Sequence, residues 1–296
     1  MPEEGIDLIE KSHIMTLEEI VAIVKVYQKL GVDTVRLTGG EPLVRKNVGF
    51  LIKELAALGL TLKLTTNGIL LDKYLDLFKE VGLRKINISL DSLDKSKAAF
   101  ITKRDYFDRI MQNIKLALDK GMEVKLNIVL IKGVNDLELL DFLRLTQKQK
   151  LTVKFIEFMP FKGNQWDWSK GISQQEILDK AQKEFGQLEV LKNPKHSTSV
   201  NFKIKNALGS FGIISTITQP FCSECNRIRL TADGKMKNCL FANKEVDLLT
   251  AYRGGEDIEA LILGGIKQKK YSRDGMELKM DAKQYENNRS MISIGG

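Results

Sequence analysis

The three cysteines of the chain, Cys222, Cys225 and Cys239, have the spacing of metal ligands, C-x2-C-x13-C. A C-x2-C turn brings two thiolates to one metal centre, and a segment of hairpin length can return a third. Three buried, reduced thiols are the alternative, because free cysteine behaves as a small apolar residue. The intervening Ser223 and Glu224 are too polar for such a core. The spacing therefore predicts a metal site.

The ligand count leaves two kinds of metal centre open. Structural zinc takes four ligands, and the fourth would have to be His13, His196 or a carboxylate. Neither histidine lies near a cysteine in the sequence. Three thiolates with one open position suit an iron–sulfur cluster that keeps one iron available for another ligand. Ligand count alone favours the cluster but does not exclude zinc.

Two arginines, Arg227 and Arg229, follow the second cysteine directly. If the segment is extended, side chains two residues apart point to the same side. Two guanidinium groups beside a metal site are well placed to hold phosphate oxygens. A pair of surface arginines with carboxylate partners is an equally good interpretation of this pattern.

Polar segments also end three predicted strands. The sequence reads TGGEP at 38–42, TTNG at 65–68 and SLD at 89–91. Paired glycines let the backbone approach a ligand closely, and the sites of α/β barrels form at the carboxyl ends of the strands. A simple tight turn would explain Gly39-Gly40 alone. Three polar strand ends in succession indicate one site.

Alternating strands and helices must position these residues. An apolar stripe over 17–30 predicts a helix, with a capping box from Thr16 to Glu19 and a stop at Gly31. A second stripe runs from Phe107 to Gly121. Strands are predicted at 33–38 and ending near residues 66, 90, 130 and 158. Strand–helix–strand repetition predicts right-handed crossovers and a parallel sheet.

The strands alternate in polarity, although parallel strands buried on both faces are normally continuous apolar runs. Apolar residues at 35 and 37, 62 and 64, 86 and 88, and 124, 126 and 128 alternate with polar residues at 36 and 38, 63 and 65, 87 and 89, and 125 and 127. One face must pack under helices while the other stays polar. This pattern favours a partial α/β barrel around a polar ligand over a flat, doubly wound sheet.

The composition changes near residue 160. A loop with both tryptophans is predicted at 161–170, a helix at 174–185, and short strands near 199–204, 211–217, 227–231 and 236–241. We therefore expect a partial barrel over 1–160 and a C-terminal, β-rich domain over 161–296 that holds all three cysteines.

The overall charge excludes little by itself. The 296 residues include 46 Lys and Arg against 38 Asp and Glu, a net charge of +8. Such a surface suits nucleic acid, an anionic membrane or a small polyanion. No basic patch interleaved with aromatic residues is present, so a nucleic-acid binder ranks last. No apolar run approaches the roughly 20 residues of a membrane span, and neither a disulfide framework nor a signal peptide is evident.

Five segments resemble the GTP 3′,8-cyclase family, the radical S-adenosylmethionine enzymes of molybdenum cofactor biosynthesis. They are RLTGGEPLVR (36–45), TTNG (65–68), NISLDS (87–92), FIEFMPF-x-G-N-x-W (155–166) and FCSECNRIRLTADGK-x-KNCLF (221–241), and the terminal Gly295-Gly296 matches as well. The segments occur in family order and cover essentially the whole chain.

The resemblance implies a (β/α)6-type incomplete barrel with two 4Fe–4S clusters. The family converts GTP to (8S)-3′,8-cyclo-7,8-dihydroguanosine 5′-triphosphate, using S-adenosyl-L-methionine as the source of a 5′-deoxyadenosyl radical. The second cluster binds the purine through its open iron, which favours a cluster over zinc at the three cysteines. Implied partners are GTP, an electron donor and the downstream cyclic pyranopterin monophosphate synthase, with a homodimer open and no nucleic acid or membrane. The implied location is the bacterial cytoplasm, with the mitochondrial matrix as the alternative.

Carried over position by position, the resemblance implies three sets of site residues. S-adenosylmethionine would contact Gly40, Ser89 and Met159. GTP would contact Arg36, Thr65, Lys125, Arg227 and Arg229. The second 4Fe–4S cluster would be held by Cys222, Cys225 and Cys239. The Gly-Gly tail would thread toward the active site.

The departure from the family is at the start. The family places C-x3-C-x2-C just before the MPEEG with which this chain begins. The ligands of the first cluster, the first barrel strand, one GTP-contacting arginine and one residue that contacts S-adenosylmethionine would then be absent. We expect a truncated chain that cannot make the radical alone. A non-catalytic GTP- or metal-binding module is the alternative.

Overall fold

An eight-stranded sheet forms the centre of the protein, in the order β1-β2-β3-β4-β5-β8-β7-β6. The computed structural model describes residues 10–276 and 289–294. β1 to β5 and β8 run parallel, whereas β7 and β6 are antiparallel additions at one edge. The strands of this sheet are β1 (Thr34–Leu37), β2 (Thr61–Thr66), β3 (Lys85–Ser89), β4 (Glu123–Leu130), β5 (Thr152–Glu157), β6 (Leu188–Leu191), β7 (Val200–Ile204) and β8 (Ser210–Ile214).

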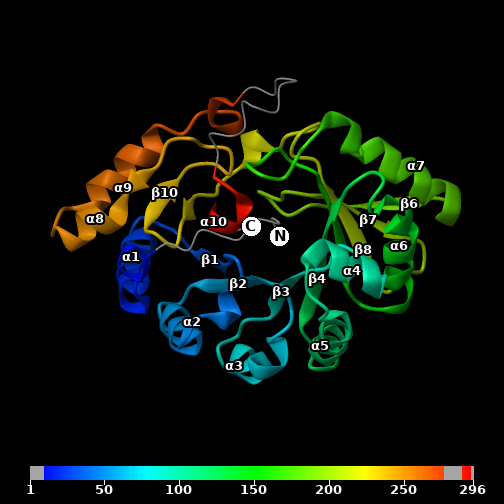
Figure 1. Ribbon diagram of the computed structural model, residues 1–296, viewed down its shortest axis with the longest axis horizontal. Coiled ribbons are helices and arrows are strands. Elements are labelled where there is room, and N and C mark those ends of the chain that lie inside the picture. The colour runs from blue at the N-terminus through cyan, green and yellow to red at the C-terminus, as the bar shows by residue number, and fades with distance from the viewer. Residues whose placement is uncertain (1–9, 277–288, 295–296) are drawn as a thin grey trace.

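The sheet curves into an arc, and helices cover its outer side (Figure 1). The helices are α1 (Leu17–Lys29), α2 (Val48–Ala57), α3 (Leu75–Glu80), α4 (Lys95–Thr102), α5 (Phe107–Asp119), α6 (Leu139–Lys148), α7 (Gln174–Phe185), α8 (Leu248–Arg253), α9 (Ile258–Lys267) and α10 (Met291–Ile294). Short 3-10 turns, η1 to η7, connect several of them. Among the described residues, no helix is long and apolar enough to cross a membrane. The predicted α/β class with a mostly parallel sheet is confirmed.

The predicted polarity of the strands is visible in their burial. Along β4, Val124, Leu126, Ile128 and Leu130 are buried, while the residues between them keep partial exposure. The buried face joins one large core with the helices. Because side chains alternate along a strand, the intervening polar residues face the inside of the arc.

The helix predictions are confirmed closely. α1 begins after Thr16, whose Oγ1 accepts from the Glu19 N–H at 3.1 Å, while the Glu19 carboxylate accepts from the Thr16 N–H at 2.7 Å. This reciprocal pair satisfies two backbone donors that a helix start leaves unpaired. α7 covers the predicted range 174–185, and α5 begins at Phe107.

The sheet continues across the domain boundary expected at residue 160. β8 pairs in parallel with β5, and β7 and β6 extend the same sheet. The segments from β9 onward lie apart from it. β9 (Arg229–Leu230), β10 (Lys235–Lys237) and β11 (Val246–Asp247) form a small antiparallel sheet. Residues 161–296 therefore contribute to both ends of the arc, because strand pairing depends on contacts that composition does not record.

The small sheet closes on the first helix. Ile23 and Tyr27 of α1 pack in one apolar cluster with Met236, Leu248 and Ile262. α8, α9 and β10 consequently lie beside α1 and β1 (Figure 1). β1 is at an edge of the large sheet, and the expected absence of an earlier strand stays a prediction.

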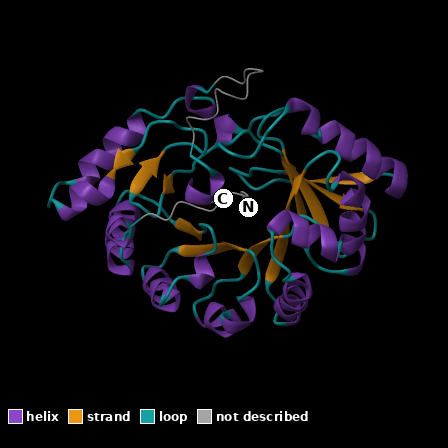
Figure 2. Cartoon of the chain, viewed as in Figure 1, coloured by secondary structure: helices purple, strands orange, loops and turns teal. Residues whose placement is uncertain are grey.

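The last described segment, α10, lies within the arc of strands in the view of Figure 1 and Figure 2. Arg289 anchors it: Nη1 and Nη2 donate to the two Asp233 carboxylate oxygens at 3.0 and 2.9 Å, and Nη2 to Glu245 Oε2 at 2.6 Å. Met291 packs against the cluster of Phe161, Ile217 and Phe241. The Gly-Gly tail lies outside the described residues.

Candidate active site inside the barrel

Polar side chains line up across the inner face of the parallel strands. Thr65 on β2 is the register partner of Asn87 on β3, which pairs in turn with Lys125 on β4. Arg36 on β1 pairs with Lys63 on β2, and its Nη1 lies 3.4 Å from Thr65 Oγ1. The structure therefore brings together Arg36, Thr65 and Lys125, three of the five residues predicted to contact GTP.

The interior carries a concentrated positive charge. Burial lowers the pKa of Arg36, and the nearby charge of Arg227 lowers it further. The pKa of Lys125 is lowered by burial and then by the charges of Lys85 and Arg36. The pKa of Lys63 is lowered by burial and then by the charges of Arg36 and Lys85. A polyanion bound here would relieve both the repulsion and the lost hydration.

Lys154 on β5 is a further interior cation that the sequence analysis did not select. Its side chain is buried, and Nζ donates to Ser199 Oγ at 2.6 Å and to Asn201 Oδ1. Gly212 on β8 makes the room, since a Cβ there would collide with that Nζ. Burial, followed by the charge of Lys125, lowers the pKa of Lys154 to about 7. Strand alternation could have identified Lys154 from the sequence, because this alternation places its side chain on the inner face of the sheet.

Glu41 joins two of the polar strand ends. Its Oε1 accepts from Thr66 Oγ1 at 2.7 Å, and its Oε2 accepts from the Asn67 N–H at 2.6 Å. The TGGEP loop is thereby held against the TTNG turn. Gly40, predicted to contact S-adenosylmethionine, precedes this anchor and is exposed, with open space where a side chain would stand.

Ser89 and Met159 complete the predicted S-adenosylmethionine set. Ser89 ends β3, and Met159 follows β5 by two residues, so both lie at the same edge of the parallel sheet as Gly40. Met159 packs against an apolar cluster that includes Phe161 and Cys239. The three residues therefore share one edge of the sheet, and Met159 also packs against the same apolar cluster as Cys239.

The cysteines lie on η6 (Cys222–Glu224), directly after it, and after β10. All three are free thiols with intermediate exposure. The Arg273 N–H points to Cys222 Sγ at 3.5 Å, and Lys269 Nζ lies 3.9 Å from Cys225 Sγ. N–H donors to sulfur are typical of iron–sulfur sites, where they tune the reduction potential.

The charges around the thiols affect their ionisation differently. Burial raises the pKa of Cys239, and repulsion from Cys222 and Cys225 raises it further. Burial also opposes ionisation of Cys225, but the Arg227 N–H and the charges of Arg227 and Lys269 outweigh it, so its pKa is lowered. This environment favours a thiolate at one end of the site.

No histidine joins the thiols as a ligand in the described part of the chain. There, no group of three or more His, Cys, Asp or Glu side chains, the three cysteines included, is arranged to hold a metal ion. His196 does lie beside the cysteine turn, where its Nδ1 is 2.9 Å from the Glu224 carbonyl oxygen. Nδ1 must donate in that contact. The assignment of the three thiols to an iron–sulfur cluster therefore stays a prediction.

Arg227 connects the thiols with the barrel interior. It lies over the Phe221 ring, with Cζ 4.9 Å from the ring centroid, and its carbonyl accepts from Lys269 Nζ at 2.8 Å. Its charge acts on both Cys225 and Arg36. Arg229 is partly buried nearby; desolvation lowers its pKa first, and the charge of Arg227 lowers it further. The two predicted arginines therefore act on the same region.

Glu157 positions the loop that leads to the cysteines. Its Oε2 accepts from the N–H groups of Ile217 and Thr218, at 2.6 and 3.1 Å, and only 7% of the residue is exposed. This carboxylate at the end of β5 thereby fixes the start of the cysteine segment. Its role leaves no signal in the sequence, because the partners lie about 60 residues away in the chain.

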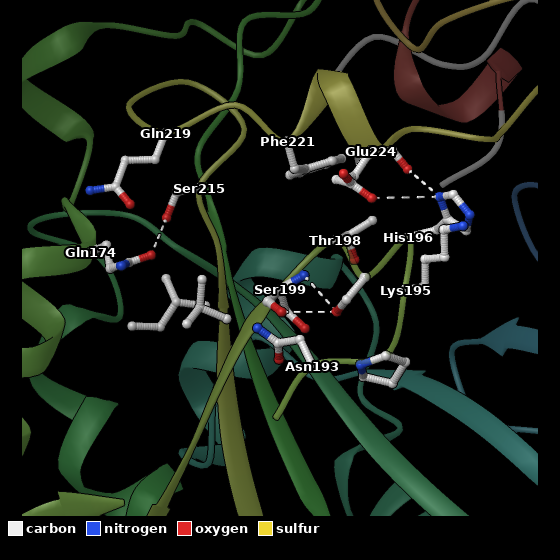
Figure 3. A pocket seen from close by; sticks show the side chains of 14 residues that line it. Gln174, Asn193, Lys195, His196, Thr198, Ser199, Ser215, Gln219, Phe221 and Glu224 are labelled. Carbon is white, nitrogen blue, oxygen red and sulfur yellow. Dashed lines mark hydrogen bonds and ion pairs between the residues drawn. The ribbon is translucent and has the colours of Figure 1, made fainter. Parts of the chain in front are cut away.

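A pocket of about 350 Å³ lies beside the cysteine turn, with Phe221 and Glu224 among the residues that line it (Figure 3). Ser215 Oγ donates to Gln174 Oε1 at 3.0 Å on one side of it, and His196 contacts Glu224 on the other. The residues that line it are Gln174, Asn193, Pro194, Lys195, His196, Ser197, Thr198, Ser199, Val200, Ile213, Ser215, Gln219, Phe221 and Glu224. A polyanion is better matched by the cationic interior than by this pocket.

The curved parallel sheet with its polar strand ends defines the class of protein, an α/β protein with the radical SAM fold. Residues 5–146 match the Radical SAM superfamily, and residues 151–274 match Molybdenum Cofactor Synthesis C. The fold is similar to a crystal structure of Streptococcus suis SuiB bound to S-adenosylmethionine, with a TM-score of 0.56 and 15% identity, over 90% of this chain and 63% of that one.

Sequence similarity assigns the chain more narrowly: it belongs to the GTP 3′,8-cyclase family. It is 43% identical over 302 residues to "GTP 3',8-cyclase, mitochondrial" of Arabidopsis thaliana, covering all of this chain and 76% of that protein. It is 43% identical over 282 residues to "Molybdenum cofactor biosynthesis protein 1" of Bos taurus, covering 93% of this chain and 44% of that one.

Proposed function

We propose that this chain is the body of a GTP 3′,8-cyclase, which binds GTP inside the barrel and acts in molybdenum cofactor biosynthesis. The observation that carries the proposal is the continuity of charge from the barrel to the thiols. Arg36 and Lys125 lie on the inner strands, Cys225 lies at the cysteine turn, and the charge of Arg227 acts on both regions. One nucleotide can occupy both, with its phosphates among the cations and its base near the thiols.

The site residues differ in which part of the ligands they would bind. Arg36, Lys125 and Arg229 would hold the phosphate oxygens, and Thr65 offers a hydroxyl between the strands. Cys222, Cys225 and Cys239 would hold a 4Fe–4S cluster, and the N–H groups directed at their sulfurs fit that role. When bound, such a cluster supplies an open iron that can accept a purine nitrogen or oxygen.

S-adenosylmethionine would be held at the strand ends by Gly40, Ser89 and Met159. All three cysteines of the sequence belong to the site described above, so we expect the chain as printed to bind one cluster. We also expect it to bind GTP. A non-catalytic GTP-binding module is the second candidate, which the same cysteine placement favours.

The remaining features of the proposal are biological. We place the protein in the bacterial cytoplasm, with the mitochondrial matrix as the alternative in view of the Arabidopsis relative's designation. The division into 1–160 and 161–296, a homodimer, and the downstream cyclic pyranopterin monophosphate synthase as a partner in the pathway stay predictions.

The experiment is anaerobic reconstitution of the chain with iron and sulfide, followed by metal analysis and GTP titration. We expect about four irons and four sulfides per chain, together with a change in the cluster's electron paramagnetic resonance spectrum on adding GTP. Cys239→Ser should lose most of the iron, whereas Lys53→Ala, on the exposed surface of α2, should lose none. Stoichiometric zinc without labile sulfide would defeat the cluster assignment.

A further inference from the structure

The cationic interior contains a lysine that the family resemblance does not assign. Lys63 on β2 lies beside Arg36 on β1, its register partner, and two residues before Thr65 on the same face of the strand. It therefore stands among residues predicted to contact GTP. A strand advances about 3.3 Å per residue, so Lys63 and Thr65 offer contacts at successive positions along an extended ligand.

Lys63 is placed where a cation costs free energy unless an anion is present. Burial lowers its pKa first, then the charges of Arg36 and Lys85, and the opposing charge of Asp33 is the weakest cause. Like charges on neighbouring strands destabilise a sheet. The positions of these side chains therefore imply a negative ligand between them.

The two cationic neighbours of Lys63, Lys85 and Arg36, differ in whether a carboxylate pairs with them. Lys85 forms an ion pair with Glu123, with Nζ and Oε2 3.7 Å apart. Within residues 10–276 and 289–294, neither Lys63 nor Arg36 has a carboxylate within ion-pairing distance. These two cations consequently remain available to a ligand on the inner face.

We propose that Lys63, together with Arg36, binds the outer phosphates of the nucleotide and makes the site selective for a triphosphate over a monophosphate. This inference rests on the proposed function and deepens it. A lysine ammonium is a compact charge with three donors, which suits the several oxygens of a phosphate chain. The base and the first phosphate would be held by other groups, so Lys63 would contribute little to a monophosphate.

The test is calorimetric titration of GTP, GMP and inorganic tripolyphosphate into the reconstituted chain and two variants. Lys63→Met keeps the aliphatic stem but removes the charge, and we expect it to weaken GTP and tripolyphosphate about tenfold. Its effect on GMP should stay within about twofold. Lys63→Arg should retain most of the affinity for GTP, because it keeps a donor cation at the same position.

The matched control is Lys53→Met, which removes the same charge from the outer surface, where Lys53 pairs with Glu80 at 3.0 Å. Equal affinities for GTP in Lys63→Met and Lys53→Met would overturn the inference. So would an equal loss of GTP and GMP binding in Lys63→Met, which would mean that Lys63 does not distinguish the phosphates. Should Lys63→Met not fold, failure of the folded Lys63→Arg to bind GTP better than GMP would overturn the inference.

The same titrations separate this inference from the proposed function. Binding of GTP that does not depend on Lys63 would support the proposed function and show that Lys63 is not part of the GTP site. Binding of tripolyphosphate that depends on Lys63, with GTP bound no more tightly than tripolyphosphate, would support the phosphate site and contradict the proposed function. If the unsubstituted chain binds neither GTP nor tripolyphosphate, both the inference and the proposed function are contradicted.

Discussion

Single residues in the barrel interior derive their properties from where the strands place them. Lys154 and Lys63 are ordinary lysines in sequence, but burial and neighbouring cations lower the pKa of both. Glu157 is an ordinary strand carboxylate until the fold brings two backbone N–H groups to it. The consequences can be measured one residue at a time.

The stability of the chain should depend on pH through Lys154. Its pKa is lowered from 10.5 to about 7. Below about pH 7 the ammonium is charged in both states, so the cost of burying it is fully present. Between about 7 and 10.5 the unfolded chain binds the extra proton, so raising the pH stabilises the fold. The free energy of unfolding, relative to Lys154→Met, should rise by at most about 1.4 kcal/mol per pH unit from pH 7 to 9.

Chemical denaturation of both proteins at several pH values measures this difference. A difference that does not vary with pH would show that Lys154 keeps its ordinary pKa in the folded chain.

Replacing Glu157 should loosen the loop before the cysteines. Glu157→Gln leaves one neutral acceptor for the N–H groups of Ile217 and Thr218, in place of a charged carboxylate. We expect a loss of about 1–2 kcal/mol in the free energy of unfolding and a lower iron content after reconstitution. Glu184→Gln, on the exposed surface beside Arg144, is the control and should change neither. Full iron retention with unchanged stability in Glu157→Gln would contradict the positioning role.

At the scale of elements, the C-terminal segment depends on one arginine. Arg289 joins the segment before α10 to the turn before β10 through Asp233, and Glu245 strengthens the pair. Lys237, which is 1% exposed, forms an ion pair with Glu245, with Nζ and Oε1 3.3 Å apart. α10 itself has four residues, too few to be stable without such an anchor.

Arg289→Gln should therefore release this segment while leaving the sheet intact. We expect the amide hydrogens of residues 289–294 to exchange about tenfold faster, with little change in β4 or β5. Hydrogen exchange followed by mass spectrometry measures both regions. Arg144→Gln removes exposed ion pairs with Asp141 and Glu184 and serves as the comparison. Equal protection in the two variants would mean that packing of Met291 and Ile294 alone holds the segment.

At the scale of the whole molecule, the two halves of the chain complete each other. β8 pairs with β5, and the cluster of Met236, Leu248 and Ile262 covers the apolar side of α1. A chain that ended at residue 160 would expose an unpaired strand edge and an uncovered helix face.

We therefore expect residues 1–160, expressed alone, to lack a cooperative unfolding transition. Thermal and urea denaturation followed by circular dichroism test this, with the full chain as the reference. A sharp, reversible transition in the fragment would show that the expected division at residue 160 marks an independent domain.

Local patterns in the sequence were sufficient for much of this molecule. The alternation around Val124 and Leu126 predicted an inner polar face, because side chains of a strand alternate regardless of what surrounds it. Thr16 and Glu19 predicted the start of α1, since a capping box needs only four consecutive residues. The shared site that the spacing of the cysteines indicates stays a prediction.

Tertiary structure alone decided the rest. The pairing of β8 with β5, the anchor of Arg289 on Asp233, and the seat of Lys154 between Ser199 and Asn201 join residues 45 to 58 positions apart. Such contacts leave no periodic trace in sequence, because their free energy comes from desolvation and from distances that exist only after the chain has folded.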